Sequence, residues 1–83
     1  MYHVYAIYNQ NHNKIYIGQT IDIDERIILH NSNTFKNSFT NRFEGIWKFI
    51  YQEEFKTRQE ALKREKQLKS YRGREFINKH IPL

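Results

Sequence analysis

The chain contains no cysteine, which excludes disulfide bonds and metal sites built from thiolates. It has no run of about 18 apolar residues, so the sequence predicts no membrane-spanning helix. The N-terminus has no basic segment followed by an apolar one, so no secretory signal is visible and the default expectation is a cytoplasmic protein. Linkers, internal repeats and low-complexity stretches are also absent. We therefore expect a single domain over residues 1–83.

Positive charge, in contrast, is present in excess. Fourteen Lys and Arg against nine Asp and Glu give a formal net charge of +5 and a pI of about 9.6. This balance favours a polyanionic partner such as a nucleic acid. Hydrophobic residues make up 39% of the chain and charged residues 28%, which fits a soluble globular domain rather than a disordered chain. At 83 residues, the domain is near the lower limit for a self-sufficient core.

Residues 2–20 are predicted to form a β-hairpin around which the rest of the chain is organised. Two runs rich in β-branched and aromatic residues flank a polar, Asn-rich loop at 10–13. A four-residue loop places Tyr5 opposite Gly18 and keeps Tyr5 and Tyr16 on one face as diagonal neighbours, roughly 7–8 Å apart. An odd-length loop would separate the two tyrosines. On spacing alone, both could equally be ordinary strand residues. The two strands are predicted over residues 2–8 and 14–19.

Five short motifs follow one another along almost the whole chain. They are H-V-Y at 3–5, Y-I-G at 16–18, Arg26 ten residues after Tyr16, His30 four residues further on, and E-A-L-K-R-E at 60–65. In this order and spacing they resemble the GIY-YIG nuclease family, and the overlapping segment R-E-K-Q-L-K-S is typical of its small stand-alone members. His3 replaces the name-giving glycine at a position that is tolerant in the family. The resemblance implies an α/β (α+β) fold, in which helices flank a three-stranded antiparallel sheet that begins with the hairpin, and an enzyme that hydrolyses DNA.

Residues 21–31 are predicted to form a short helix. Asp22 can cap its N-terminus, and Glu25 completes a capping-box pattern. At about 100° per residue, Ile23 and Ile27 mark the buried side of this helix.

Arg26 and His30 lie one turn apart beside that apolar stripe. Polar groups at such an edge can point into a cleft between a helix and a sheet. An exposed arginine and a surface histidine would be the commoner arrangement in the absence of the hairpin. The tyrosines of the hairpin favour the cleft.

Residues 57–70 are predicted to form a second helix, with Thr57 and Glu60 as its capping box. Glu65 projects into the middle of its apolar arc, which is formed by Ala61, Leu62 and Leu68. Burying a carboxylate without a partner is costly. We therefore expect a cation, a metal ion or strong hydrogen-bond donors beside Glu65, and an ion pair with Arg26 is one alternative.

The remaining segments are described by weaker patterns. Residues 46–55 are predicted to form a third strand, in which one side carries Trp47, Phe49, Tyr51 and Glu53. The aromatic residues of this side are expected to cover one helical layer. Residues 31–45 are predicted to form a surface loop that contacts either the core or a nucleic acid, or else a helical stripe of Phe35, Phe39 and Phe43. Gly73 is predicted to break the preceding helix, with a last short helix over residues 74–80.

The candidate catalytic residues are Tyr5, Tyr16, Arg26, His30 and Glu65. The resemblance implies a tyrosine as general base, and the choice between the two tyrosines stays open. The pKa of a tyrosine, ordinarily about 10, must be lowered by Arg26 or by a metal ion for this role. Arg26 offers a planar donor fork to the phosphate, and His30 either positions the water or contacts the phosphate.

Glu65 is predicted to bind the catalytic metal ion. Because the candidate set offers one carboxylate, we expect a single Mg²⁺ or Mn²⁺ that retains waters rather than two metal ions. Asn78 matches a late asparagine of some family members poorly in spacing.

Two alternatives remain beside a DNA endonuclease. One is a non-catalytic nucleic-acid-binding module with the same fold, and the other is an accessory subunit whose protein partner supplies target recognition. The sequence leaves open the oligomeric state, the single-stranded, duplex or branched form of the DNA, its target sequence, and the pathway, with DNA repair among several.

Overall fold

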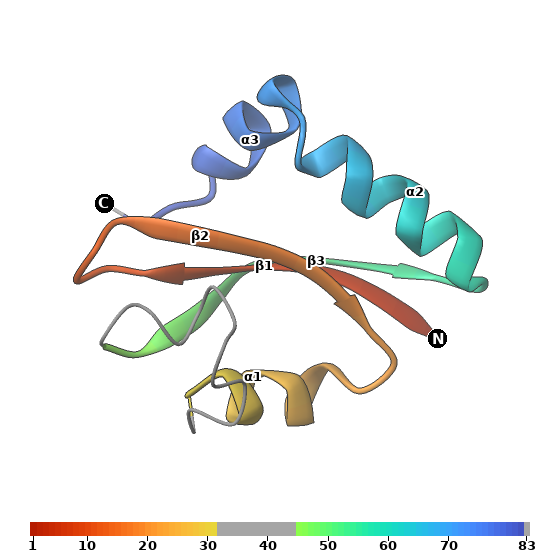
Figure 1. Cartoon of the computed structure of the whole chain (residues 1–83), viewed down its shortest axis with the longest axis horizontal. Helices are drawn as coiled ribbons and strands as arrows, with labels where there is room; N and C mark the ends of the chain where they lie inside the picture. The colour runs from red at the N-terminus through yellow and green to blue at the C-terminus, as the bar shows by residue number, and fades with distance from the viewer. Residues whose placement is uncertain (32–44, 83) are drawn as a thin grey trace.

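Three strands and three helices make up the computed structural model, which describes residues 1–31 and 45–82. The strands form one antiparallel sheet in the order β2-β1-β3, so the predicted α+β fold is confirmed. Helices α2 and α3 cover one face of the sheet, and α1 lies against the other (Figure 1). None of the described helices has the length and apolar character needed to cross a membrane. The elements are β1 (Tyr2–Asn9), β2 (Lys14–Thr20), α1 (Ile23–Asn31), β3 (Trp47–Phe55), α2 (Arg58–Leu68) and α3 (Tyr71–Asn78).

The hairpin of β1 and β2 has the predicted register. Asn9 pairs with Lys14, and Tyr5 lies opposite Gly18. The backbone of Asn13 in the connecting turn adopts a φ of 52°, a left-handed conformation that asparagine tolerates better than most residues. Because the loop contains an even number of residues, Tyr5 and Tyr16 face the same side of the sheet. Their ring centroids are 6.2 Å apart.

Strand β3 contains an irregularity that the sequence pattern did not predict. Its register against β1 shifts after the pair of Ile7 and Phe49, which leaves Ile50 as an extra residue. Such a bulge reverses the faces of the residues beyond it. Trp47 and Phe49 therefore pack on the α1 side, whereas Tyr51 packs on the side of α2 and α3. The prediction that the aromatic residues of this strand share one face is wrong.

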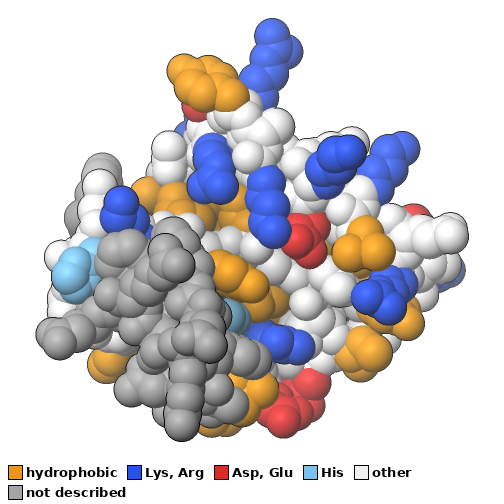
Figure 2. All heavy atoms as spheres, viewed as in Figure 1, with side chains coloured by type: hydrophobic (Ala, Val, Ile, Leu, Met, Phe, Trp, Pro, Cys, Tyr) orange, Lys and Arg blue, Asp and Glu red, His pale blue; other side chains and the backbone are white. Residues whose placement is uncertain are grey.

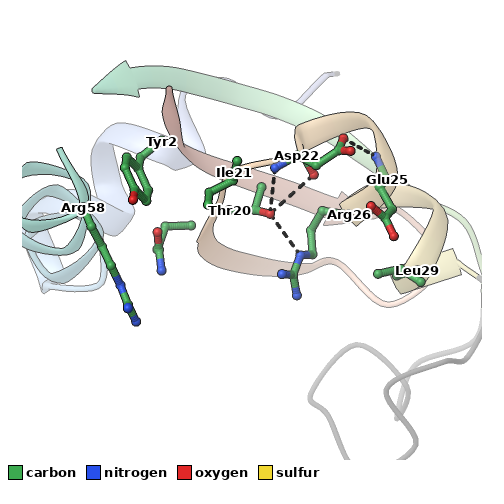
Figure 3. Close-up of a pocket in the computed structure, with 9 residues that line it drawn as sticks. Tyr2, Thr20, Ile21, Asp22, Glu25, Arg26, Leu29 and Arg58 are labelled. Carbon is green, nitrogen blue, oxygen red and sulfur yellow. Dashed lines mark hydrogen bonds between the residues drawn. The ribbon is translucent and has the colours of Figure 1, made fainter. Parts of the chain in front are cut away.

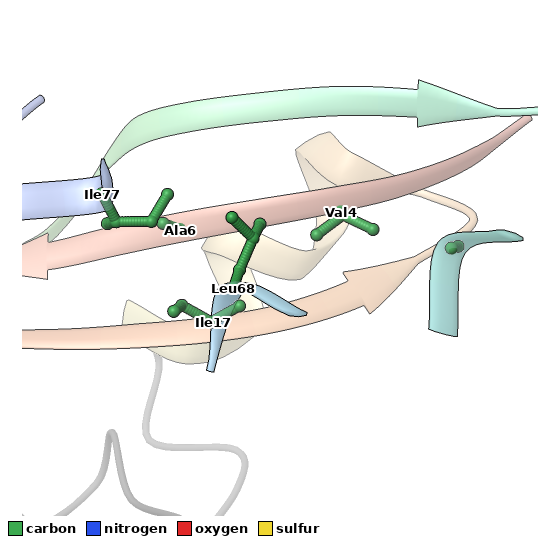
Figure 4. Close-up of a cluster of buried hydrophobic side chains, with 6 residues drawn as sticks. Val4, Ala6, Ile17, Leu68 and Ile77 are labelled. Atoms are coloured by element: carbon green, nitrogen blue, oxygen red, sulfur yellow. The ribbon is translucent and has the colours of Figure 1, made fainter. Parts of the chain in front are cut away.

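Two apolar clusters hold the helices on the sheet. The larger lies between the sheet and the pair α2 and α3 (Figure 4), and consists of Val4, Ala6, Ile17, Ala61, Leu68 and Ile77. The second lies under α1, where Tyr5, Ile7 and Trp47 are buried and contact Ile23 and Ile27. The apolar side predicted for α1 is thus confirmed. The predicted N-cap is also present, since Asp22 Oδ1 accepts a hydrogen bond from the Glu25 N–H at 3.0 Å. The Asp22 N–H, however, donates to Thr20 Oγ1 and not to the Glu25 side chain, as a full capping box would require.

Helix α2 begins after Thr57, whose hydroxyl oxygen accepts a hydrogen bond from the Glu60 N–H at 3.2 Å, as the capping pattern predicts. Ala61 and Leu68 are buried, but Leu62 is 43% exposed. Leu62 therefore does not belong to the buried arc. It follows Ala61 by one residue, which turns it about 100° around the helix axis.

Gly73 lies inside α3 and does not terminate the preceding helix, so this prediction is wrong. A Cβ atom at Gly73 would lie 2.2 Å from the Gln67 carbonyl oxygen and 2.4 Å from the Leu68 Cα. The glycine therefore allows α3 to pack directly against the end of α2. The stripe proposed for Phe35, Phe39 and Phe43, and most of the loop predicted at 31–45, fall outside the described residues.

Candidate active site

Three ring side chains from three different elements meet on the α1 side of the sheet. They are Tyr5 of β1, Tyr16 of β2 and His30 of α1. The Tyr5 hydroxyl oxygen lies 2.9 Å from Nε2 of His30, and the ring centroids of Tyr16 and His30 are 4.9 Å apart. The structure thus brings together three of the five predicted site residues in direct contact.

Gly18 provides the space in which the two tyrosine rings lie. A Cβ atom at this position would be 2.9 Å from both the Tyr5 hydroxyl oxygen and the Tyr16 Cε2 atom. Phe49 of β3 also contacts the Tyr5 ring edge-on, with centroids 5.9 Å apart. Tyr5 is therefore held across the sheet, between β3 and the glycine of β2.

The protonation states of Tyr5 and His30 follow from their burial, since they are 1% and 4% exposed. Burial raises the pKa of Tyr5; the charges of Tyr16 and Glu65 raise it further, and Arg26 opposes them. Burial also lowers the pKa of His30 to about 4, with the charge of Arg26 acting in the same direction. At neutral pH the imidazole is uncharged and the Tyr5 hydroxyl keeps its proton. In the His30 tautomer with the proton on Nδ1, the Tyr5 hydroxyl donates a hydrogen bond to Nε2.

Arg26 is half-buried in the middle of α1, and its Nε–H donates to Thr20 Oγ1 at 3.4 Å. The same Thr20 oxygen accepts the Asp22 N–H at 3.3 Å, as Figure 3 shows. Thr20 thus fixes the start of α1 and the guanidinium group together. The sequence analysis missed Thr20. A threonine two residues before a helix-capping aspartate, where its hydroxyl can bond the nearby backbone, was the available signal.

The far end of α1 is attached to the sheet by Asn31, another residue that the sequence analysis missed. Its Oδ1 accepts the Trp47 N–H at 2.8 Å, and its Nδ2 donates to the Trp47 carbonyl at 3.2 Å. These bonds hold the helix turn that carries His30 against β3. No sequence pattern indicated this contact, because the two residues are sixteen positions apart.

Glu65 approaches the site from α2, on the other side of the sheet. It shares the buried line of Ala61 and Leu68, and its side chain is 19% exposed. Its Oε2 accepts a hydrogen bond from Lys69 Nζ at 2.7 Å, so Lys69 is the cation that pairs with it. The charge of Glu65 is the smallest of the causes that raise the pKa of Tyr5.

Glu65 is the carboxylate that the sequence predicts to bind a metal ion. Among the described residues, no group of three or more His, Cys, Asp or Glu side chains is arranged to hold a metal ion. Glu65 offers one carboxylate, shared with Lys69. Mg²⁺ commonly binds one or two carboxylates and completes its shell with waters and substrate phosphate oxygens, so Glu65 is the residue that would hold such an ion.

A pocket of about 390 Å³ opens beside Arg26, where the end of β2, the start of α1 and the start of α2 meet. Arg58 lines it, a residue that the sequence analysis did not single out. Asn78 lies elsewhere, with Asn13 and Lys14 at the loop end of the hairpin. The structure therefore adds Arg58 to the neighbourhood of the site and leaves Asn78 outside it.

Comparison with known proteins gives a consistent result. Residues 1–79 match the family model of the GIY-YIG catalytic domain. The UPF0213 protein SERP0126 of Staphylococcus epidermidis is 33% identical over 69 residues, which cover 83% of this chain and 82% of that protein. The UPF0213 protein SSP2268 of Staphylococcus saprophyticus is 37% identical over 57 residues, with coverages of 69% and 67%.

A solved structure is similar over nearly the whole chain. It is the solution NMR structure of the UPF0213 protein BH0048 from Bacillus halodurans, with a TM-score of 0.55 and 27% identity. The match covers 95% of this chain and 84% of the other. The fold described here therefore also occurs in a solved UPF0213 protein.

Proposed function

The chain belongs to the GIY-YIG catalytic-domain family and has its nuclease-type fold, and from this premise we propose that it is a metal-dependent endonuclease that hydrolyses DNA phosphodiester bonds. One observation carries the proposal. Tyr5, Tyr16 and His30 meet on one side of the sheet, and the charges of Arg26 and Glu65 act on Tyr5. A phenol pair, a guanidinium and a carboxylate are groups that phosphodiester hydrolysis can use.

The distribution of charge supports a polyanionic substrate. Residues 58–79 contain eight Lys and Arg and three Glu, an excess that equals the formal net charge of +5 of the whole chain. Lys and Arg side chains accordingly gather over α2 and α3 in the upper half of Figure 2. Glu65 lies within this basic segment. A DNA backbone would therefore be attracted to the side of the molecule that carries the carboxylate.

The two tyrosines receive different roles in the proposal. Tyr5 is buried and its pKa is raised, so it is poorly suited to act as a base. We assign it to positioning, together with His30. Tyr16 lies half-buried on the edge strand β2, where water and a phosphate can approach its hydroxyl. We assign to Tyr16 the acceptance of a proton from the attacking water.

Arg26 and Glu65 act on the charge of the phosphate. With its Nε held by Thr20, the Arg26 guanidinium is oriented to donate to phosphate oxygens. A divalent ion bound at Glu65 would supply Lewis-acid stabilisation of the phosphate charge. Lys69 balances the Glu65 carboxylate in the structure described here, and we expect its ammonium to move aside when an ion binds.

The test is cleavage of labelled single-stranded, duplex and branched DNA, with and without Mg²⁺ or Mn²⁺. Wild type should cleave at least one substrate, and only with the ion. Glu65→Gln should fold and bind DNA but lose cleavage by two or more orders of magnitude. Glu75→Gln, which removes an exposed glutamate from α3, should cleave normally. Full activity of Glu65→Gln would remove this residue from the mechanism, and DNA binding without cleavage by wild type would favour a non-catalytic binding module.

A further inference from the structure

The pocket beside Arg26 contains a second arginine that the catalytic roles do not use. Arg26 lines one wall of the pocket, and Arg58, the first residue of α2, lines another. Figure 3 shows both guanidinium groups extending toward the same open side. The charge of Arg26 also influences the pKa values of Tyr5 and His30. Arg26 therefore belongs to both places, and the pocket directly adjoins the active site.

Arg58 has no protein partner among the described residues, in contrast to Arg64 and Arg74. The Nε of Arg64 donates to Glu53 at 3.0 Å, and the Nε of Arg74 donates to the Lys69 carbonyl at 3.2 Å. In the part of the chain that the structure describes, no hydrogen bond or ion pair holds the Arg58 guanidinium, and the residue is exposed. Its planar set of donors is thus available to an anion at the pocket.

We propose that this pocket is a subsite for the phosphodiester next to the one that is cleaved, and that Arg58 is its phosphate ligand. The inference rests on the proposed nuclease function. A DNA strand whose scissile phosphate lies at Arg26 must continue past the neighbouring surface in one direction or the other. The pocket is a hollow on that surface with a cation on its far wall.

The other residues of the pocket determine where the phosphate lies within it. Asp22 and Glu25 belong to the α1 side of the pocket (Figure 3), where their carboxylates repel a phosphate. Asp22 Oδ1 is further engaged by the Glu25 N–H. The phosphate is therefore placed at the Arg58 wall. The base faces α1, where its amino group can donate to a carboxylate.

The first experiment measures DNA affinity against salt in the Glu65→Gln background, so that binding is observed without cleavage. Each phosphate neutralised contributes about 0.9 to the slope of log K against log salt for duplex DNA, or about 0.7 for single strands. Arg58→Gln should reduce that slope by about one such increment and raise KM of the active enzyme with kcat unchanged. The control is Lys48→Gln, which removes an exposed charge from the opposite end of the sheet and should leave both quantities unchanged.

A second experiment identifies the phosphate that Arg58 contacts. Once the cleavage position is mapped, a neutral methylphosphonate replaces the phosphate on either side of the scissile one. On one side, the replacement should weaken DNA binding severalfold in the protein that retains Arg58. In the Arg58→Gln variant, the same replacement should weaken binding no further. If the wild type cleaves DNA, but the effects of Arg58→Gln and of the methylphosphonate on binding are additive on both sides, this inference alone is overturned. If the wild type cleaves no DNA, the proposed function is overturned as well.

Discussion

Replacing Tyr5 by Phe removes one buried hydroxyl group and keeps the aromatic ring. The lost contact is the 2.9 Å hydrogen bond to His30 Nε2, between two residues that are 1% and 4% exposed. A typical hydrogen bond contributes about 0.5–1.5 kcal/mol, and depriving a buried group of its partner costs about 1–3 kcal/mol. We therefore expect the free energy of unfolding to fall by about 1–3 kcal/mol. For a domain of this size, each kcal/mol lowers Tm by about 4–8 °C.

Tyr16→Phe should give the opposite pattern. The Tyr16 side chain is half-buried on the edge strand, so we expect its hydroxyl to contribute less than about 1 kcal/mol to stability. As the proposed general base, however, it should account for about 10²–10⁴-fold in the rate of cleavage. The two variants thus separate a positioning tyrosine from a catalytic one.

Both quantities can be measured on the same preparations. Chemical denaturation followed by circular dichroism reports stability, and single-turnover cleavage at saturating Mg²⁺ reports the chemical step. Tyr71→Phe is the control, because Tyr71 is 80% exposed and should change neither quantity. The assigned roles would be refuted if Tyr5→Phe unfolded like the wild type, or if Tyr16→Phe cleaved DNA at the wild-type rate.

Two further predictions concern the surroundings of these tyrosines. Gly18→Ala places a methyl group 2.9 Å from the Tyr5 oxygen and from Tyr16 Cε2. The free energy of unfolding should therefore fall by about 1–3 kcal/mol, and the cleavage rate should fall with it. Normal stability and normal cleavage would contradict the tight packing around Gly18. His30 has a pKa of about 4 in the folded chain against about 6.5 when unfolded, so the unfolded state binds more protons between these values. Its contribution to stability is therefore full above pH 6.5 and is lost as the pH falls to 4, by up to about 1.4 kcal/mol per pH unit. Denaturation midpoints across this range should depend on pH less in His30→Gln than in wild type, and equal dependence would exclude His30 as the cause.

Features that depend on local bonding could be predicted from the order of the residues. The length of the loop set the hairpin register that brings Tyr5 opposite Gly18. The start of α1 at Asp22 and that of α2 at Thr57 followed from side chains that bond backbone groups three residues away. Such patterns are readable because both partners lie within one turn of the chain. The residues suggested for the active site also came from the sequence, through the spacing of the family's motifs.

Features that depend on how separate elements pack became visible in the folded structure. The extra residue at Ile50 reverses the face of Tyr51, and nothing in the alternation of β3 indicates where its register against β1 shifts. Gly73 allows two helices to touch, although a glycine at that place in the sequence resembles a helix breaker. Arg58 reads as a surface charge on α2, and it lines a pocket with Arg26 because packing brings the starts of two helices to one end of the sheet. The contacts of Tyr51 and Arg58 join residues tens of positions apart, and those of Gly73 join two helices across a short turn. Their geometry is fixed by the shape of the packed core rather than by any local pattern.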